Sequence, residues 1–182
     1  MEVLKDILGE ITQVINNVNE SEMDGVVDFI TKNKRVFVCG EGRSGLIGKC
    51  FAMRLMHIGY TVYVVGETIT PSIKADDVLF AISGSGETSM VLNLVRKSKD
   101  MGAHIIGITS REGSSLASAS FKKIIVPGAV KGDKGTDKKS IQLLSSLFDQ
   151  SVHIVMDALC LKLSYKDRID NDAAIKNHSN LE

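Results

Sequence analysis

The spacing of apolar residues along the chain predicts helices that alternate with short strands. Apolar positions recur at helical spacing from Leu4 to Val18, and this indicates an amphipathic helix over residues 2–18. Met23, Val26 and Ile30 indicate a second, shorter helix. Short apolar runs rich in β-branched residues predict five strands, over residues 35–39, 60–65, 77–82, 104–109 and 122–126. Further helices are expected over residues 46–58, 87–101 and 141–164, with a shorter helical piece leading into the C-terminal tail.

This alternation favours an α/β fold with a parallel sheet, because βαβ units bury short apolar strands under helices on both faces. We therefore expect a five-stranded, doubly wound sheet of the flavodoxin-like kind with an N-terminal helical arm. A chain of 182 residues has the size of one domain. No internal repeat or low-complexity linker divides it, so residues 1–182 are expected to form a single domain.

Glycine and serine concentrate in two loops, which follow the first and third predicted strands. Residues 40–45 read GEGRSG and residues 83–88 read SGSGET, and each loop leads into a helix. In a flavodoxin-like strand order the first and third strands lie side by side, at the switch point where ligands bind. The two loops are therefore expected to meet at one site.

The chemistry of these loops favours a phosphate group. Glycine lets the backbone approach a ligand closely, and the free N–H groups at a helix N-terminus attract anions. Serine and threonine hydroxyls add hydrogen-bond donors, and no lysine follows as it does in a nucleoside triphosphate loop. Arg43 is expected either to hold substrate oxygens or to anchor its loop, and Glu67 to bind a hydroxyl group of the substrate. The residues expected to bind substrate are Gly42, Arg43, Ser44, Glu67, Ser83, Gly84, Ser85, Gly86 and Thr88.

Two other interpretations of the loops remain open. Serine and glycine before a helix often form only a cap and a tight turn. Gly40, Gly42 and Gly45 also satisfy the G-x-G-x-x-G pattern of dinucleotide-binding domains, with Glu67 placed to grip a ribose. The dinucleotide interpretation leaves residues 83–88 unexplained, and the chain has no room for a second substrate domain.

Composition excludes several other classes of protein. Lys and Arg number 22, Asp and Glu also number 22, and aromatic residues make up 5%, which argues against nucleic acid or an anionic membrane as a partner. No apolar run reaches the roughly 20 residues of a membrane span, and the charged N-terminus does not resemble a signal peptide. Cys39, Cys50 and Cys160 lack metal-ligand spacing, so we expect buried free thiols in the cytoplasm and no zinc site.

Several motifs resemble the sugar isomerase (SIS) domain family and, within it, the 6-phospho-3-hexuloisomerases. The resemblance covers essentially the whole chain. The Ser/Gly loop is shared by all SIS domains, whereas the run at 51–59 and the last five residues are specific to the subfamily. The matching segments are residues 42–45, 51–59, 65–71, 83–88, 146–150 and 178–182.

The resemblance implies a definite reaction and assembly. Such enzymes interconvert D-arabino-3-hexulose 6-phosphate and fructose 6-phosphate in formaldehyde assimilation through the ribulose monophosphate pathway, and they need no metal or organic cofactor. They are usually homotetramers whose sites are completed by neighbouring subunits. Two alternatives are a non-catalytic phosphosugar sensor and an isomerase of another phosphosugar.

Moving a ketone from C3 to C2 through a cis-enediol requires one base that reaches both carbons. Asp149 is the candidate, because it lies early on the long predicted helix among Leu143, Leu144, Leu147 and Phe148. Burial there would raise its pKa toward neutrality. The family usually has a glutamate at this position, which is one methylene longer. An aspartate that only complements the helix dipole is the alternative.

The resemblance also singles out two histidines as catalytic candidates. It implies that His57 is a proton donor or hydroxyl ligand, and that His178 acts at a neighbour's site. Position alone favours a structural role for His57 on its apolar helix and a disordered tail around His178. His153 shares a helix face with Asp149 but matches no family motif, so we interpret it as structural. A loop is expected over residues 127–140, and its run of charged residues is interpreted as solvated, with a lid over the sugar as the alternative. The run consists of Lys131, Asp133, Lys134, Asp137, Lys138 and Lys139.

Overall fold

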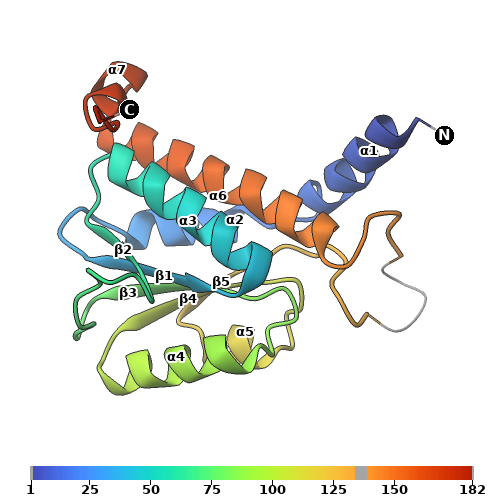
Figure 1. Ribbon diagram of the computed structural model, residues 1–182, viewed down its shortest axis with the longest axis horizontal. Helices are drawn as coiled ribbons and strands as arrows, with labels where there is room; N and C mark the ends of the chain where they lie inside the picture. Colours follow the sequence, from blue (N-terminus) through green and yellow to red (C-terminus); the bar gives the residue numbers. More distant parts are fainter. Residues whose placement is uncertain (1, 134–138, 182) are drawn as a thin grey trace.

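The computed structural model describes residues 2–133 and 139–181 and has three layers, a parallel sheet between two layers of helices (Figure 1). The strands lie in the order β2-β1-β3-β4-β5, and all neighbouring pairs are parallel. This confirms the doubly wound, flavodoxin-like fold. The strands are β1 (Val36–Gly40), β2 (Val62–Val64), β3 (Val78–Ile82), β4 (His104–Thr109) and β5 (Lys122–Ile125).

The register of the central strands brings the two Ser/Gly loops together. Gly40, the last residue of β1, is paired with Ile82, the last residue of β3. Because parallel strands end at the same edge of the sheet, the chain leaves β1 and β3 side by side. The expected switch point therefore lies between these two strands.

Helices cover both faces of the sheet (Figure 1). On one face lie α2 (Glu20–Phe29), α3 (Gly42–His57) and α6 (Ser146–Asp167), and on the other lie α4 (Ser89–Asp100) and α5 (Ser115–Ala119). The short α7 (Asn171–Ile175) follows α6. The arm α1 (Val3–Ile15) buries Ile11 and Val14 but extends away from the sheet, and Leu4 and Leu8 stay exposed.

The strands are apolar throughout because both of their faces are covered. Val38, Phe80 and Ile106 belong to the core under α3 and α6. Phe37 and Leu79, which point to the opposite face, belong to the core under α4 and α5. Successive strand residues thus alternate between two cores, as parallel sheets require.

Two helices begin several residues away from the predicted position, and one helix was not predicted. α3 begins at Gly42, inside the stretch expected to be a loop. α6 begins at Ser146 rather than 141, because Leu144 adopts a left-handed conformation (φ 55°) that no helix continues through. α5 was not predicted, since its sequence SLASA is too short and too polar to show a helical period.

The prediction of three buried thiols is correct for two of them. Cys39 and Cys160 are buried, whereas Cys50 is exposed on α3. Burial raises the pKa of Cys39 to about 12, and it also raises the pKa of Cys160. Only the Cys50 thiol is accessible to solvent among the three.

Candidate active site

The connection from β1 into α3 is a tight reversal of the backbone. A Cβ atom on Gly45 would lie 2.7 Å from the carbonyl oxygen of Gly40, so no larger residue fits without moving the backbone. Glu41 at the N-cap makes no side-chain hydrogen bond to the helix. The first-turn amides of α3 are therefore free of a side-chain cap, and Arg43 and Ser44 lie on that first turn.

Hydrogen bonds between its own residues stabilise the conformation of the loop after β3. The Ser83 hydroxyl accepts a hydrogen bond from the Gly86 amide (3.1 Å) and lies 2.8 Å from the Thr88 hydroxyl. The Ser85 hydroxyl accepts from the Glu87 amide (3.2 Å). Gly86 has a positive φ of 69°, and a Cβ there would lie 2.2 Å from the Ser114 hydroxyl oxygen. The loop conformation thus depends on glycine at this position.

Asp149 lies on the first turn of α6 and faces the β1–α3 loop. Its side chain is buried, and the Ser44 hydroxyl donates a hydrogen bond to Oδ1 at 3.0 Å. Nε of Arg43 lies 3.8 Å from Oδ2. Burial raises the pKa of Asp149, whereas Ser44 and Arg43 favour the carboxylate and oppose the rise. The expected direction of the pKa shift is confirmed.

The apolar surroundings of Asp149 are only partly those predicted. Leu147 and Phe148 are buried beside it, but Leu143 and Leu144 are exposed. The reason is that α6 starts after these two leucines, so they do not lie on its buried face. The desolvation of Asp149 comes from its place between α3 and α6.

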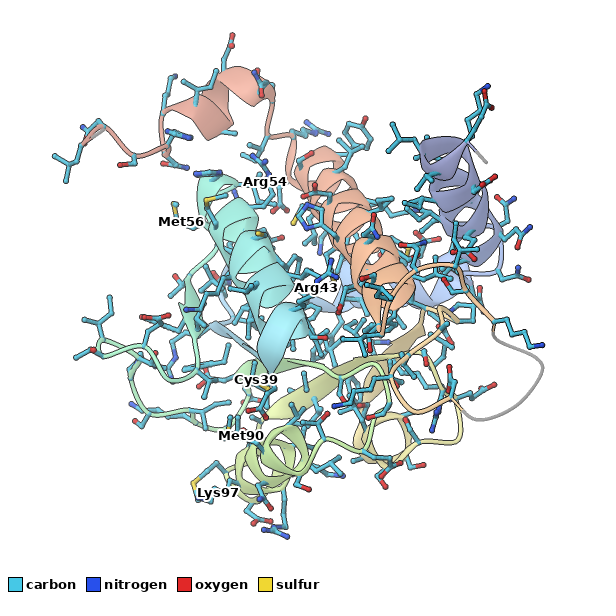
Figure 2. All side chains as sticks on the ribbon, turned by 45° about the vertical axis from the view of Figure 1, so that its right-hand side comes forward. Cys39, Arg43, Arg54, Met56, Met90 and Lys97 are labelled. Carbon is cyan, nitrogen blue, oxygen red and sulfur yellow. The ribbon has the colours of Figure 1, made fainter. Side chains whose placement is uncertain are left out.

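Arg43 joins the first turns of α3 and α6. Its guanidinium donates to the Ser146 hydroxyl at 2.5 Å, in addition to the contact with Asp149. Figure 2 shows Arg43 between the two helices and Arg54 near the other end of α3. In this structure Arg43 anchors its loop, which is one of the two roles expected for it.

A small cavity adjoins the Asp149 carboxyl group between the two helices. Its volume is about 180 Å³. Ser146 and Gln150 were not predicted as neighbours of this site, although their spacing from Asp149 on one helix indicated proximity. His153 was expected on the same helix face as Asp149 but was interpreted as structural. The cavity is lined by Arg43, Leu46, Ile47, Asp149, Gln150 and His153.

The two catalytic histidine candidates lie together at the other end of α3. The rings of His57 and His178 stack with centroids 5.1 Å apart, and the Asn177 amide donates to the His57 carbonyl oxygen (2.9 Å). Burial lowers the pKa of His57, and Arg54 and His178 lower it further. Thirteen helical residues separate His57 from Ser44, a distance of about 20 Å along the axis. Within one chain these histidines do not reach Asp149.

Glu67 also lies apart from Asp149 in this chain. Its carboxylate pairs with Nζ of Lys49 on α3, with an oxygen to nitrogen distance of 2.5 Å. His104 lies 3.5 Å from Asp76 at the start of β4, at the opposite end of the sheet from the Ser/Gly loops.

Part of the charged segment after β5 is packed against the site. Ala129 and Val130 are buried, and a Cβ on Gly84 would lie 2.7 Å from Cγ1 of Val130. Asp133 pairs with Arg111 and accepts a hydrogen bond from the Val130 amide (3.0 Å). Ala129 and Val130 thus precede the charged run and belong to the core. Lys131 and Lys139 of that run are exposed, as the solvated interpretation predicts. Residues 134–138, to which the same interpretation and the lid alternative apply, lie outside the described residues.

Two searches of residues 2–133 and 139–181 bear on other kinds of site. No group of three or more His, Cys, Asp or Glu side chains in these ranges could hold a metal ion. No helix within them is long and apolar enough to cross a membrane.

Comparison with known proteins identifies the family. Residues 29–153 match the SIS domain. The chain is 35% identical over 181 residues to the 3-hexulose-6-phosphate isomerase of Bacillus subtilis. The alignment covers 100% of this chain and 98% of the relative. It is 38% identical over 173 residues to the 3-hexulose-6-phosphate isomerase of Mycobacterium gastri. That alignment covers 95% of this chain and 86% of the relative.

A solved structure agrees with these relatives. A hypothetical protein of Methanococcus jannaschii, for which a molecular function of 3-hexulose-6-phosphate isomerase has been inferred, superimposes with a TM-score of 0.84 and 33% sequence identity over 100% of both chains. The match to the SIS domain over residues 29–153 and the strand order contradict the dinucleotide interpretation of the first loop. The chain belongs to the SIS domain family and, within it, to the 3-hexulose-6-phosphate isomerases.

Proposed function

We propose that this chain, acting as a single SIS domain, interconverts D-arabino-3-hexulose 6-phosphate and fructose 6-phosphate with Asp149 as the base. The observation that carries the proposal is a buried carboxylate beside two Ser/Gly loops at a switch point. Its pKa is raised by burial, as a base working near neutral pH requires.

The loops would hold the phosphate group of the sugar. The amides and hydroxyls of residues 83–88 and the first-turn amides of α3 supply donors without a net charge. Ser44 links the two parts of the site, because it lies on the first turn of α3 and its hydroxyl donates a hydrogen bond to Asp149. A phosphate bound there would put the sugar carbons toward the Asp149 cavity.

In the reaction, the Asp149 carboxylate takes the proton from C2 of the 3-ketose. The electron pair of that C–H bond forms the C2=C3 double bond while the O3 carbonyl oxygen accepts a proton, which gives the cis-enediol. Loss of the proton on O2 and return of a proton from Asp149 to C3 then complete the 2-ketose. One carboxyl group serves both carbons, which are adjacent.

His57 and His178 are proposed to act from a neighbouring subunit, as proton donor or hydroxyl ligand. Along α3, His57 lies about 20 Å from Ser44, the residue that contacts Asp149, and His178 stacks on His57. This separation supports the assignment. An exposed apolar surface supports the homotetramer in which such sharing would occur. On α3 and α6 this surface consists of Leu46, Met53, Met56, Ile154 and Leu161.

Glu67 is proposed to contact a sugar hydroxyl once substrate displaces Lys49, and Arg43 to contact substrate oxygens from its anchored position. The reaction needs only proton transfers, so we propose that it proceeds without a metal or organic cofactor. A phosphorylated substrate and unpaired thiols support a cytoplasmic location.

A coupled assay tests the function. The wild-type protein is supplied with 3-hexulose 6-phosphate, made in situ from ribulose 5-phosphate and formaldehyde, and the appearance of fructose 6-phosphate is followed. Turnover is expected. Tight binding of the sugar phosphate by calorimetry without turnover would contradict the enzymatic function and support the phosphosugar sensor.

A further inference from the structure

His153 lies one helical turn after Asp149 on α6 and lines the same cavity. Residues four apart on a helix have Cβ atoms about 6 Å apart and face the same way. A six-carbon sugar with an adjacent pair of reacting carbons can therefore meet both side chains at once. No other histidine of the described residues borders the Asp149 cavity.

A second carboxylate lies within ion-pair distance of the His153 ring, one turn further along the helix. The Nε2 atom of His153 lies 3.7 Å from Oδ2 of Asp157. Asp157 also lies near Arg54 of α3, whose Nε is 4.0 Å from Oδ1. With Nε2 facing Asp157, Nδ1 of His153 is the ring nitrogen that we assign to a ligand. A histidine oriented by a carboxylate is the usual arrangement of a proton-transfer group.

We propose that His153 moves protons between the substrate oxygens O3 and O2 while Asp149 moves the proton between the carbons. The inference rests on the proposed function and adds the second acid–base group of the same site. It leaves His57 and His178 the role of hydroxyl ligands supplied by a neighbour.

The step balances without another reactant. Protonated His153 gives its proton to O3 as Asp149 removes the proton from C2, and the neutral imidazole then takes the proton from O2 as Asp149 returns one to C3. Both residues end in their starting protonation states. The charged groups near the His153 ring are Arg43, Asp149 and Asp157, and Arg54 lies near Asp157.

The experiment compares histidine variants in the fructose 6-phosphate assay. His153→Gln is expected to lower kcat by about 10²-fold or more, because a positioned acid–base group contributes about 10²–10⁴-fold. KM is expected to change by less than about 3-fold, since residues 83–88 hold the phosphate. His104→Gln is the matched control, because His104 also pairs with an aspartate but lies near the opposite end of the sheet. It should retain wild-type kcat.

Chemical rescue distinguishes proton transfer from a structural role. Imidazole in the buffer is expected to restore turnover saturably to His153→Ala and not to Asp149→Ala. A kcat of His153→Gln within about 3-fold of wild type, or loss of kcat in His153→Ala that imidazole does not relieve, would overturn the role of His153 alone. Absence of wild-type turnover would instead overturn the proposed function and this inference with it.

Discussion

Gly84 lies where the loop of residues 83–88, which we propose binds phosphate, meets the segment after β5. A single methyl group added there should be harmful. A Cβ at this position would lie 2.7 Å from Cγ1 of Val130 and 3.0 Å from Cδ1 of Phe148. Both neighbours are buried, and Phe148 precedes Asp149. Gly84→Ala therefore forces either the 129–133 segment away from the loop or the start of α6 out of place.

The expected cost follows from these contacts. Overpacking costs about 1–3 kcal/mol. The backbone of Gly84 is not in the left-handed region, so alanine also gains about 0.4–1 kcal/mol by restricting the unfolded chain. The midpoints of these two ranges leave a net loss of about 1.3 kcal/mol, which should lower Tm by about 3–5 °C for a chain of this length. KM for the sugar phosphate should rise by an order of magnitude or more, since a misplacement of about 1 Å can cost about 10²-fold.

Thermal unfolding and steady-state kinetics on four proteins test this reasoning: wild type, Gly84→Ala, Val130→Ala and the double variant. Removing Cγ1 of Val130 relieves the closest overlap, so the loss in the double variant should be smaller than the sum of the two single losses by about 1 kcal/mol. Gly9→Ala is the control, because nothing lies within 4 Å of its Cβ, and it should be no less stable than wild type. A stable Gly84→Ala with unchanged KM, or strict additivity with Val130→Ala, would refute the packing argument.

Three further predictions concern the pKa of Asp149, the pH dependence of stability and the accessibility of the thiols. Ser44→Ala removes the hydrogen bond to the Asp149 carboxylate, so the pKa of Asp149 should rise. The acid limb of the pH profile of kcat should then move to higher pH. An acid limb at the wild-type pH would contradict a role for this hydrogen bond. Glu10 accepts hydrogen bonds from Ser140, Ile141 and Gln142, which hold its pKa below 4.5 against the opposing effect of burial. The stabilising contribution of Glu10 is therefore present above pH 4.5 and is lost as pH falls through the lower pKa of the folded state. The decrease in Tm caused by Glu10→Ala should be largest near pH 7 and should shrink in acid. A decrease independent of pH would contradict these hydrogen bonds. The native protein should react with one equivalent of a thiol reagent, at exposed Cys50, and with three after unfolding, and protection of all three thiols in the native protein would contradict this.

Local patterns were sufficient to predict the sheet and its switch point. The strands are short apolar runs bounded by glycine and polar residues, and β4 was predicted with its bounds unchanged at residues 104–109. The N-terminus of α6 was missed because Ile141, Leu143 and Leu144 continue the helical pattern, whereas Leu144 is left-handed and interrupts the helix. Just before it, residues 140–142 bind Glu10 of α1, a pairing across about 130 positions that no local window contains.

The site was predictable where its residues follow strands and unpredictable where it depends on helix packing. Ser44 and residues 83–88 could be placed near the same edge of the sheet because they follow β1 and β3, which are neighbours. The Arg43–Ser146 and Ser44–Asp149 contacts depend on how α3 lies against α6, which periodicity does not specify. His57 and His178 were linked to the site by resemblance alone, and the structure puts them together at the far end of α3.

Solvent exchange at carbon tests the role of Asp149 most directly. Fructose 6-phosphate is incubated with the protein in D₂O, and deuterium at C3 is followed by NMR for wild type, Asp149→Asn and Asp149→Glu. The enediol mechanism predicts deuterium at C3 with wild type, loss of exchange by about 10³-fold or more with Asp149→Asn, and measurable exchange with Asp149→Glu. Exchange by Asp149→Asn at the wild-type rate would contradict the assignment of Asp149 as the base.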